Sequence, residues 1–134
     1  MRLTEDNIVK LLINYLEKNN YEIESFCLGH QRGYDIVSIK NNKKFIIEVK
    51  GAKANYNSKI KKRKFFDSGQ IKDHLGKAIV KSIETKLENK DADVGIAHPD
   101  DDYIKKTIGL ITPKLKELGI THMWVNKDGS VIFD

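Results

Sequence analysis

The feature that most constrains the fold is a pair of apolar runs on either side of Asn41-Asn42. The runs lie between Gly33 and Gly51 and are rich in Ile, Val and Phe, which favour β-strands. Asparagine tolerates the left-handed backbone angles of a tight two-residue turn, so the segment is typical of a β-hairpin. We therefore expect two adjacent antiparallel strands here, around which the rest of the chain packs.

Charged side chains gather at one end of this predicted hairpin. Side chains alternate between faces along a strand, so Glu48 and Lys50 share one face while Ile47 and Val49 point to the other. Asp35 begins the partner strand, and a short hairpin can place it opposite Glu48 and Lys50. Two carboxylates and an ammonium in this arrangement suit a divalent metal ion beside a phosphate. The alternative is an exposed Glu48–Lys50 ion pair on an ordinary strand, which would contribute little stability.

The motif Asp35, then Glu48-Val49-Lys50, with Gly33 before the aspartate, resembles that of the PD-(D/E)xK nuclease superfamily. This superfamily includes many restriction enzymes and the archaeal Holliday-junction resolvases. Tyr34 stands where the name of the family has Pro, a departure that leaves the metal ligands in place.

The resemblance implies a role for each residue of the motif. Asp35 and Glu48 would bind Mg²⁺, for which Mn²⁺ can substitute, and the carbonyl of Val49 would be a further ligand. Lys50 would orient the attacking water and offset charge on the phosphate.

Two further residues are candidate site residues with a structural alternative. Glu5 lies on or beside the apolar stripe of a predicted first helix, where it either compensates the helix dipole or, as the resemblance to the junction-resolving branch implies, joins the metal site. Gln70 opens a predicted second helix, where it either forms a capping box with Asp67 or, by the same resemblance, lies near the catalytic centre.

The expected order of elements is helix, three strands, helix, strand, helix and two strands. The second helix has an apolar stripe, which we expect to be buried: Ile71, Leu75, Ala78, Ile79, Ile83 and Leu87. Pro113 interrupts the third helix, which should kink near Gly109 or start again with Thr112 as its cap. The resemblance implies an α/β, restriction-endonuclease-like core: a central mixed sheet flanked by helices.

Three aspartates, Asp100 to Asp102, precede the third helix. They invite a metal-binding interpretation, but their position at a helix start favours capping and dipole compensation.

The net charge of +5 favours a polyanionic partner, and the positive charge is densest between Lys53 and Lys64, where no acidic residue occurs. The second helix adds donors at helical spacing, His74, Lys77 and Lys81, which either track a nucleic-acid backbone or are solvated. The residues expected to contact nucleic acid are Arg32, Lys53, Lys59, Lys61, Lys62, Arg63, Lys64 and Lys77.

The length of 134 residues suits a single domain, 1–134, without a separate recognition domain. The lone Cys27 excludes an internal disulfide and a thiolate zinc site. No apolar run is long enough for a signal peptide or a membrane span, so we expect a cytoplasmic protein.

The first functional hypothesis is a Mg²⁺-dependent DNA endonuclease of restriction, repair or junction-resolving type, acting as a homodimer because a duplex has two strands. The second is a non-catalytic nucleic-acid-binding or assembly module that keeps the nuclease fold. RNA remains an alternative substrate, because no feature of the sequence indicates a contact to the sugar 2′-hydroxyl that would distinguish RNA from DNA.

Overall fold

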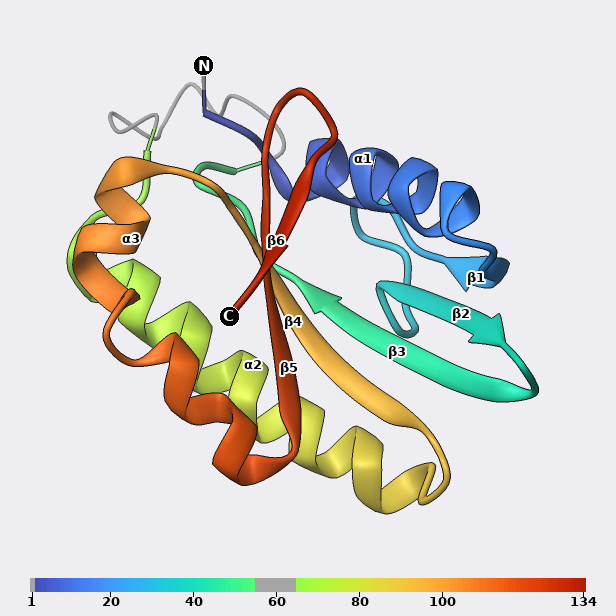
Figure 1. Ribbon diagram of the computed structural model, residues 1–134. Helices are drawn as coiled ribbons and strands as arrows, with labels where there is room; N and C mark the ends of the chain where they lie inside the picture. The colour runs from blue at the N-terminus through green and yellow to red at the C-terminus, as the bar shows by residue number, and fades with distance from the viewer. Residues whose placement is uncertain (1, 55–64) are drawn as a thin grey trace.

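A six-stranded mixed sheet with helices on both faces forms the centre of the molecule (Figure 1). The structure is a computed structural model, which describes residues 2–54 and 65–134. The strands are β1 (Glu22–Phe26), β2 (Ile36–Lys40), β3 (Lys43–Val49), β4 (Asp93–Pro99), β5 (Ile120–Val125) and β6 (Val131–Phe133). The helices are α1 (Glu5–Lys18), α2 (Ser68–Glu88), α3 (Asp102–Ile108) and the 3₁₀ helix η1 (Thr112–Leu118). The predicted order of elements and the mixed α/β sheet are confirmed.

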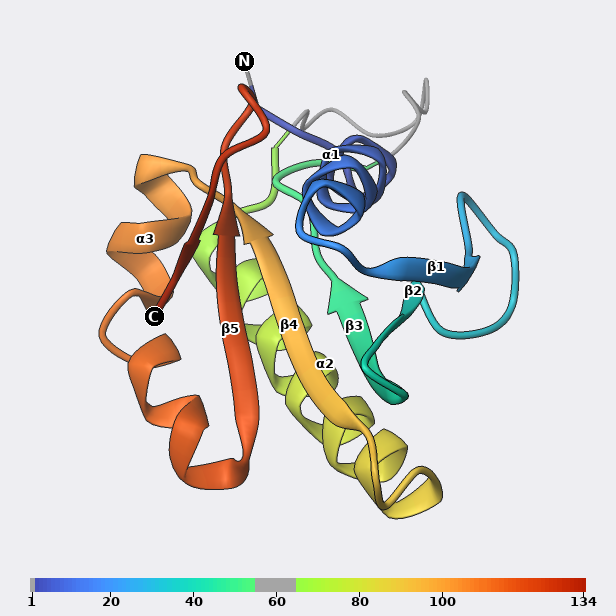
Figure 2. The ribbon, with the colours of Figure 1, turned by 45° about the vertical axis from the view of Figure 1, so that its right-hand side comes forward.

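The strands lie in the sheet in the order in which they occur in the chain. β1, β2 and β3 are antiparallel, β3, β4 and β5 are parallel, and β6 is antiparallel to β5. The two parallel connections carry α2 and then α3 with η1, so these helices cover one face, while α1 lies across the other (Figure 2). Each face has its own apolar core, one around α1 and one around α2, α3 and η1.

The central hairpin forms as its sequence predicts. β2 and β3 pair from Ile36↔Ile47 to Lys40↔Lys43, and the turn between them is Asn41-Asn42. Both asparagines have positive φ angles, 55° and 62°, as a type I′ turn requires. This register places residue 35 beside residue 48, which brings the two acids of the motif together.

The predicted apolar stripe of α2 is wrong in its second half. Ile83 and Leu87 are 40% and 69% exposed, and the residues that face the sheet there are Ser82 and Thr85. These two line a small hollow together with Glu48, so α2 presents polar atoms to the sheet at this point. Apolar periodicity predicts this helix but not the direction that its C-terminal half faces.

The segment from 100 to 118 forms two helices. α3 ends at Ile108, and the next residue has to be glycine, because a Cβ on Gly109 would lie 2.3 Å from the carbonyl oxygen of Lys105. The chain restarts at Thr112 with Pro113 in the first turn, but the cap residue is Ile111, so the prediction of Thr112 as cap is wrong. None of the described helices is long and apolar enough to cross a membrane.

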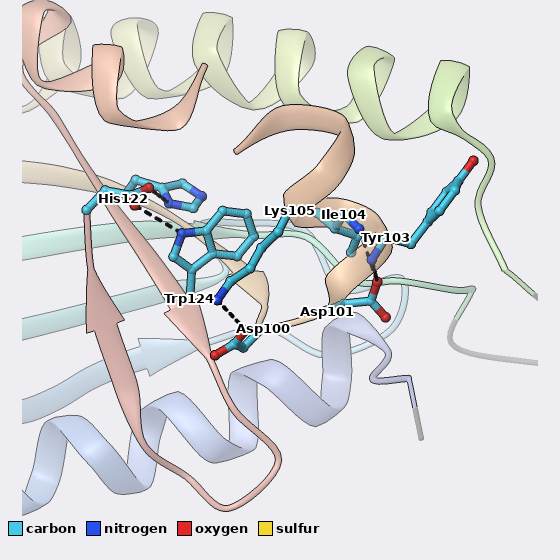
Figure 3. Close-up of polar contacts among 8 residues, drawn as sticks. Asp100, Asp101, Tyr103, Ile104, Lys105, His122 and Trp124 are labelled. Carbon is cyan, nitrogen blue, oxygen red and sulfur yellow. Dashed lines mark hydrogen bonds and ion pairs between the residues drawn. The ribbon is translucent and has the colours of Figure 1, made fainter. Parts of the chain in front are cut away.

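The aspartates before α3 cap the helix and form an ion pair. Asp101 caps the helix by accepting hydrogen bonds from the amides of Tyr103 and Ile104, at 2.9 and 3.1 Å (Figure 3). Asp100 pairs with Lys105 at 2.6 Å, as the same figure shows. The capping interpretation of this acidic cluster is thereby confirmed.

Candidate active site

The two acids of the hairpin lie against each other at the end of β3. Asp35 Oδ2 accepts a hydrogen bond of 2.8 Å from the backbone N–H of Val49, which fixes its carboxyl group beside the strand. The side chains of Asp35 and Glu48 also line the same small hollow, where a hydrogen bond with Asp35 is one cause of the raised pKa of Glu48. The β2–β3 hairpin thus brings together Asp35, directly before β2, and Glu48 in β3, which are 13 positions apart in the sequence.

Glu48 is almost completely buried, with 9% of its surface exposed. Burial, the hydrogen bond to Asp35 and the charge of Asp35 raise the pKa of Glu48 to about 8, although Lys50 and Lys81 oppose the shift. Loss of the Glu48 proton is therefore harder than for a glutamate in water. A buried acid that shares its proton with a second acid is typical of functional sites.

Glu5 reaches the same region because β3 leads directly under the start of α1. The backbone of Ala52 donates a 2.8 Å hydrogen bond to the carbonyl of Leu3. A Cβ on Gly51 would lie only 2.6 Å from the backbone nitrogen of Glu5, so only glycine permits this approach. Burial raises the pKa of Glu5; Lys50 opposes the shift and Asp35 adds to it. The charge of Glu5 therefore interacts with both residues.

Lys81 on α2 is a site residue that the motif does not identify. Its Nζ lies 3.3 Å from Oε2 of Glu48. Burial alone would lower the pKa of Lys81, but the charges of Glu48 and Asp35 outweigh it and the pKa is raised. The only signal in the sequence is the helical spacing from His74 and Lys77, which does not show that α2 packs over Glu48.

His74 lies on the same side of α2, near Lys50. It is half-buried and packs edge-on against Phe66, with 4.5 Å between ring centroids. Burial first, and then the charges of Lys50 and Lys77, lower its pKa, so the ring is a neutral neighbour of the site at pH 7.

A buried row of polar side chains continues from the site across β4 and β5. Val49 pairs with Ala97, so Lys50 lies beside His98 on the next strand. His98 Nδ1 is 2.8 Å from His122 Nε2, and His122 Nδ1 is 2.7 Å from a carboxylate oxygen of Asp134. Burial, then His122 and Lys50, hold the pKa of His98 well below its usual range, and burial lowers that of His122 to about 4. Sequence reasoning missed this row, because these residues meet only through strand pairing.

The other predicted site residues are placed as follows. Gln70 forms the capping box with Asp67. Its side-chain Oε1 accepts a hydrogen bond from the backbone N–H of Asp67 at 3.0 Å, and its backbone N–H donates to the Asp67 carboxylate at 2.9 Å.

The predicted basic residues lie away from these contacts or outside the described residues. Lys53 lies over the ring of Phe65, with 6.0 Å from Nζ to the centroid. Lys77 and Arg32 are exposed. Lys59, Lys61, Lys62, Arg63 and Lys64 lie outside the described residues.

The acidic part of the site is a pair. Within residues 2–54 and 65–134, no group of three or more His, Cys, Asp or Glu is arranged to hold a metal ion. Asp35 and Glu48 nevertheless offer hard carboxylate oxygens to one small hollow, and Mg²⁺ is commonly held by one or two carboxylates with water and phosphate completing its shell. The donor set therefore fits Mg²⁺.

Comparison with known proteins finds likeness at the level of structure. No protein-family model and no curated protein matches this chain. A crystal structure of an XisH family protein from Nostoc punctiforme is 15% identical, with a TM-score of 0.60 over 95% of this chain and 97% of that one. A fdxN element excision controlling factor protein from Anabaena variabilis is 17% identical, with a TM-score of 0.60 over 95% and 96%. At these identities the likeness shows a shared fold.

Proposed function

We propose that this chain is a Mg²⁺-dependent endonuclease that hydrolyses the phosphodiester bonds of DNA, of restriction, repair or junction-resolving type. The observation that carries the proposal is the contact of Asp35 with Glu48 at the end of β3, where Lys50 follows directly. The resemblance of these residues to the PD-(D/E)xK motif supports the same conclusion.

Each residue has a role in this proposal that follows from its chemistry. Asp35 and Glu48, with the carbonyl of Val49, would hold Mg²⁺ or Mn²⁺. The bound ion would polarise the phosphate and lower the pKa of a water molecule. Lys50 would orient that water and offset the charge that develops on the phosphoryl oxygens.

Glu5 and Gln70 would help to position the water from the two flanking helices. The charge of Glu5 already interacts with Lys50 and Asp35. Gln70 makes its capping contacts with Asp67, so a catalytic role would require its side-chain amide to leave the cap or to use its remaining hydrogen-bonding capacity.

Metal-dependent nicking is the direct test. Supercoiled plasmid, branched DNA, single strands and RNA are incubated with the protein in Mg²⁺ or in EDTA. We expect Mg²⁺-dependent cleavage that Asp35→Ala and Lys50→Ala each reduce by at least about a hundredfold, as removal of a catalytic group usually does. Asp91→Asn, an exposed acid in a turn, is the matched control and should cut normally. Equal residual cutting in all variants would contradict the proposal.

The second candidate is a non-catalytic module that binds nucleic acid through the same fold. The name of the Anabaena variabilis neighbour describes a factor that controls excision of an element, and a controlling role of this kind would not require this chain to cut. The basic segment from Lys53 to Lys64 would then supply phosphate contacts, whose affinity falls steeply with salt.

Neutralisation of the basic segment separates the two candidates. A module of this kind loses DNA binding when Lys61, Lys62, Arg63 and Lys64 are changed to Gln, while Asp35→Ala leaves binding unchanged and no cleavage occurs. Light scattering with and without duplex tests the expected homodimer in the same samples. Binding that survives neutralisation would contradict the second candidate.

A further inference from the structure

We propose that the ammonium of Lys81 takes the place of a divalent cation beside Glu48 in the metal-free protein, and moves to a backbone phosphate of the nucleic acid when the cation binds. This inference rests on the proposed nuclease function. It assigns to α2 a phosphate-binding lysine in addition to Lys50.

The position of Lys81 is that of a counter-cation. Its Nζ lies 3.3 Å from Oε2 of the buried Glu48, and its charge also interacts with that of Asp35. Lys81 is the single cationic side chain among the described residues that line the small hollow between α2 and β3, where both acids face it. A positive charge is therefore already held at the place that two carboxylates would offer to a metal ion.

The backbone that carries Lys81 is fixed, but its ammonium can move. The neighbouring Ser82 is buried against the sheet, and Thr85 anchors the next turn by donating to the Lys81 carbonyl at 2.8 Å. The Lys81 side chain itself is 46% exposed and ends on a flexible four-carbon stem. A change of side-chain rotamer therefore suffices to move the ammonium, without any change in the helix.

The surroundings of Lys81 indicate where the ammonium goes. Beyond the hollow, a groove of about 500 Å³ is lined by Tyr34, Lys81, Glu84, Thr85, Leu87 and Glu88. Its two further carboxylates repel nucleic acid, so a strand held at Lys50 approaches Lys81 from the side of Glu48. The phosphate then replaces Glu48 as the anionic partner of Lys81 once a dication has neutralised the acids.

The test measures cation affinity, independently of cleavage. Mn²⁺ binding without DNA is measured by electron paramagnetic resonance or calorimetry for the wild type, Lys81→Gln and Lys72→Gln. Lys72 is an exposed lysine of the same helix, so its variant removes an equal charge. We expect Lys81→Gln to bind Mn²⁺ roughly tenfold more tightly, because a competing cation a few ångströms away is removed, and Lys72→Gln to change affinity less than about twofold.

A second measurement follows the move to phosphate. Binding of a labelled duplex is measured in Ca²⁺ and in EDTA. Lys81→Gln should weaken DNA binding several-fold in Ca²⁺ and little in EDTA, since Lys81 is free to contact phosphate only when the cation is bound. Circular dichroism verifies that each variant is folded.

The possible results distinguish failure of the Lys81 inference from failure of the proposed nuclease function. Mn²⁺ affinity equal to that of the wild type in Lys81→Gln, or a loss of DNA binding that is the same in Ca²⁺ and EDTA, overturns the inference alone. Absence of Mn²⁺ binding in the wild type and both variants overturns the proposed nuclease function as well.

Discussion

At the scale of single residues, Glu48 is held where an ionised carboxylate is costly. It is buried, it faces a second acid, and its exposed ion-pair partner Lys81 compensates only part of that cost. An acid in this position costs folding free energy, so the site is expected to lower the stability of the protein.

Glu48→Gln tests this cost. The amide has the shape of the acid but no charge, so the variant should raise the free energy of unfolding by about 1 kcal/mol or more in EDTA, while Mn²⁺ binding is lost. Urea unfolding followed by circular dichroism measures the first effect and calorimetry the second. Glu84→Gln, an exposed acid on α2, should change neither, and a destabilised Glu48→Gln would show that the acid serves packing.

Gly51 is the second residue whose substitution is informative. A methyl group there would lie 2.6 Å from the Glu5 nitrogen and 2.9 Å from the Thr4 carbonyl carbon, both backbone atoms. We expect Gly51→Ala to lower the free energy of unfolding by roughly 2–3 kcal/mol, measured by urea unfolding.

Gly76 is the control for this prediction. It lies inside α2, where a methyl group would meet no atom within 4 Å apart from the backbone of its own helix. Gly76→Ala should therefore stabilise the protein by about 0.5–1 kcal/mol. Equal effects at Gly51 and Gly76 would show that the contact between β3 and α1 is not tight.

At the scale of elements, the sequence predicts the features that depend on residues close together in the chain. The Asn41-Asn42 turn and the approach of Asp35 to Glu48 both follow from local patterns, and the structure has both. The parallel pairing of β3, β4 and β5 is not local. His98, His122 and Lys81 therefore come near the site through contacts that no spacing in the sequence reveals.

The second half of α2 shows the same limit. Its apolar residues repeat with helical spacing, yet Leu87 is mostly exposed whereas Leu75 is buried. Leu75→Ala should lower the free energy of unfolding by about 2–4 kcal/mol, whereas Leu87→Gln should change it by less than about 0.5 kcal/mol. Thermal and urea unfolding check both values, and a large loss in Leu87→Gln would mean that this surface is covered in solution.

At the scale of the whole molecule, the buried His122 makes the free energy of unfolding depend on pH in the acid range. The pKa of His122 is about 4 in the folded protein and near 6.5 when the ring is unfolded and solvated. Between these values the unfolded chain binds the proton that the folded chain excludes. Stability is therefore fully present above about pH 6.5 and falls as the pH drops towards 4, by up to roughly 3 kcal/mol for this one group.

Urea unfolding across this range measures the effect. His122→Gln keeps a hydrogen-bonding side chain that does not titrate, so the variant should lose less stability than the wild type between pH 7 and pH 5. His30, an exposed histidine, is the control, and His30→Gln should follow the wild type. Parallel curves for all three proteins would contradict the prediction.

The sheet also has a consequence for how the chain is made. Because its strands lie side by side in the order in which they are translated, each new strand leaving the ribosome finds its partner already present at the growing edge. None of the six described strands has to insert between two that are already paired, and each closing connection joins only strands that are consecutive in the chain. Nascent chains can therefore acquire this sheet progressively, beginning with β1 and β2 and adding one strand at a time.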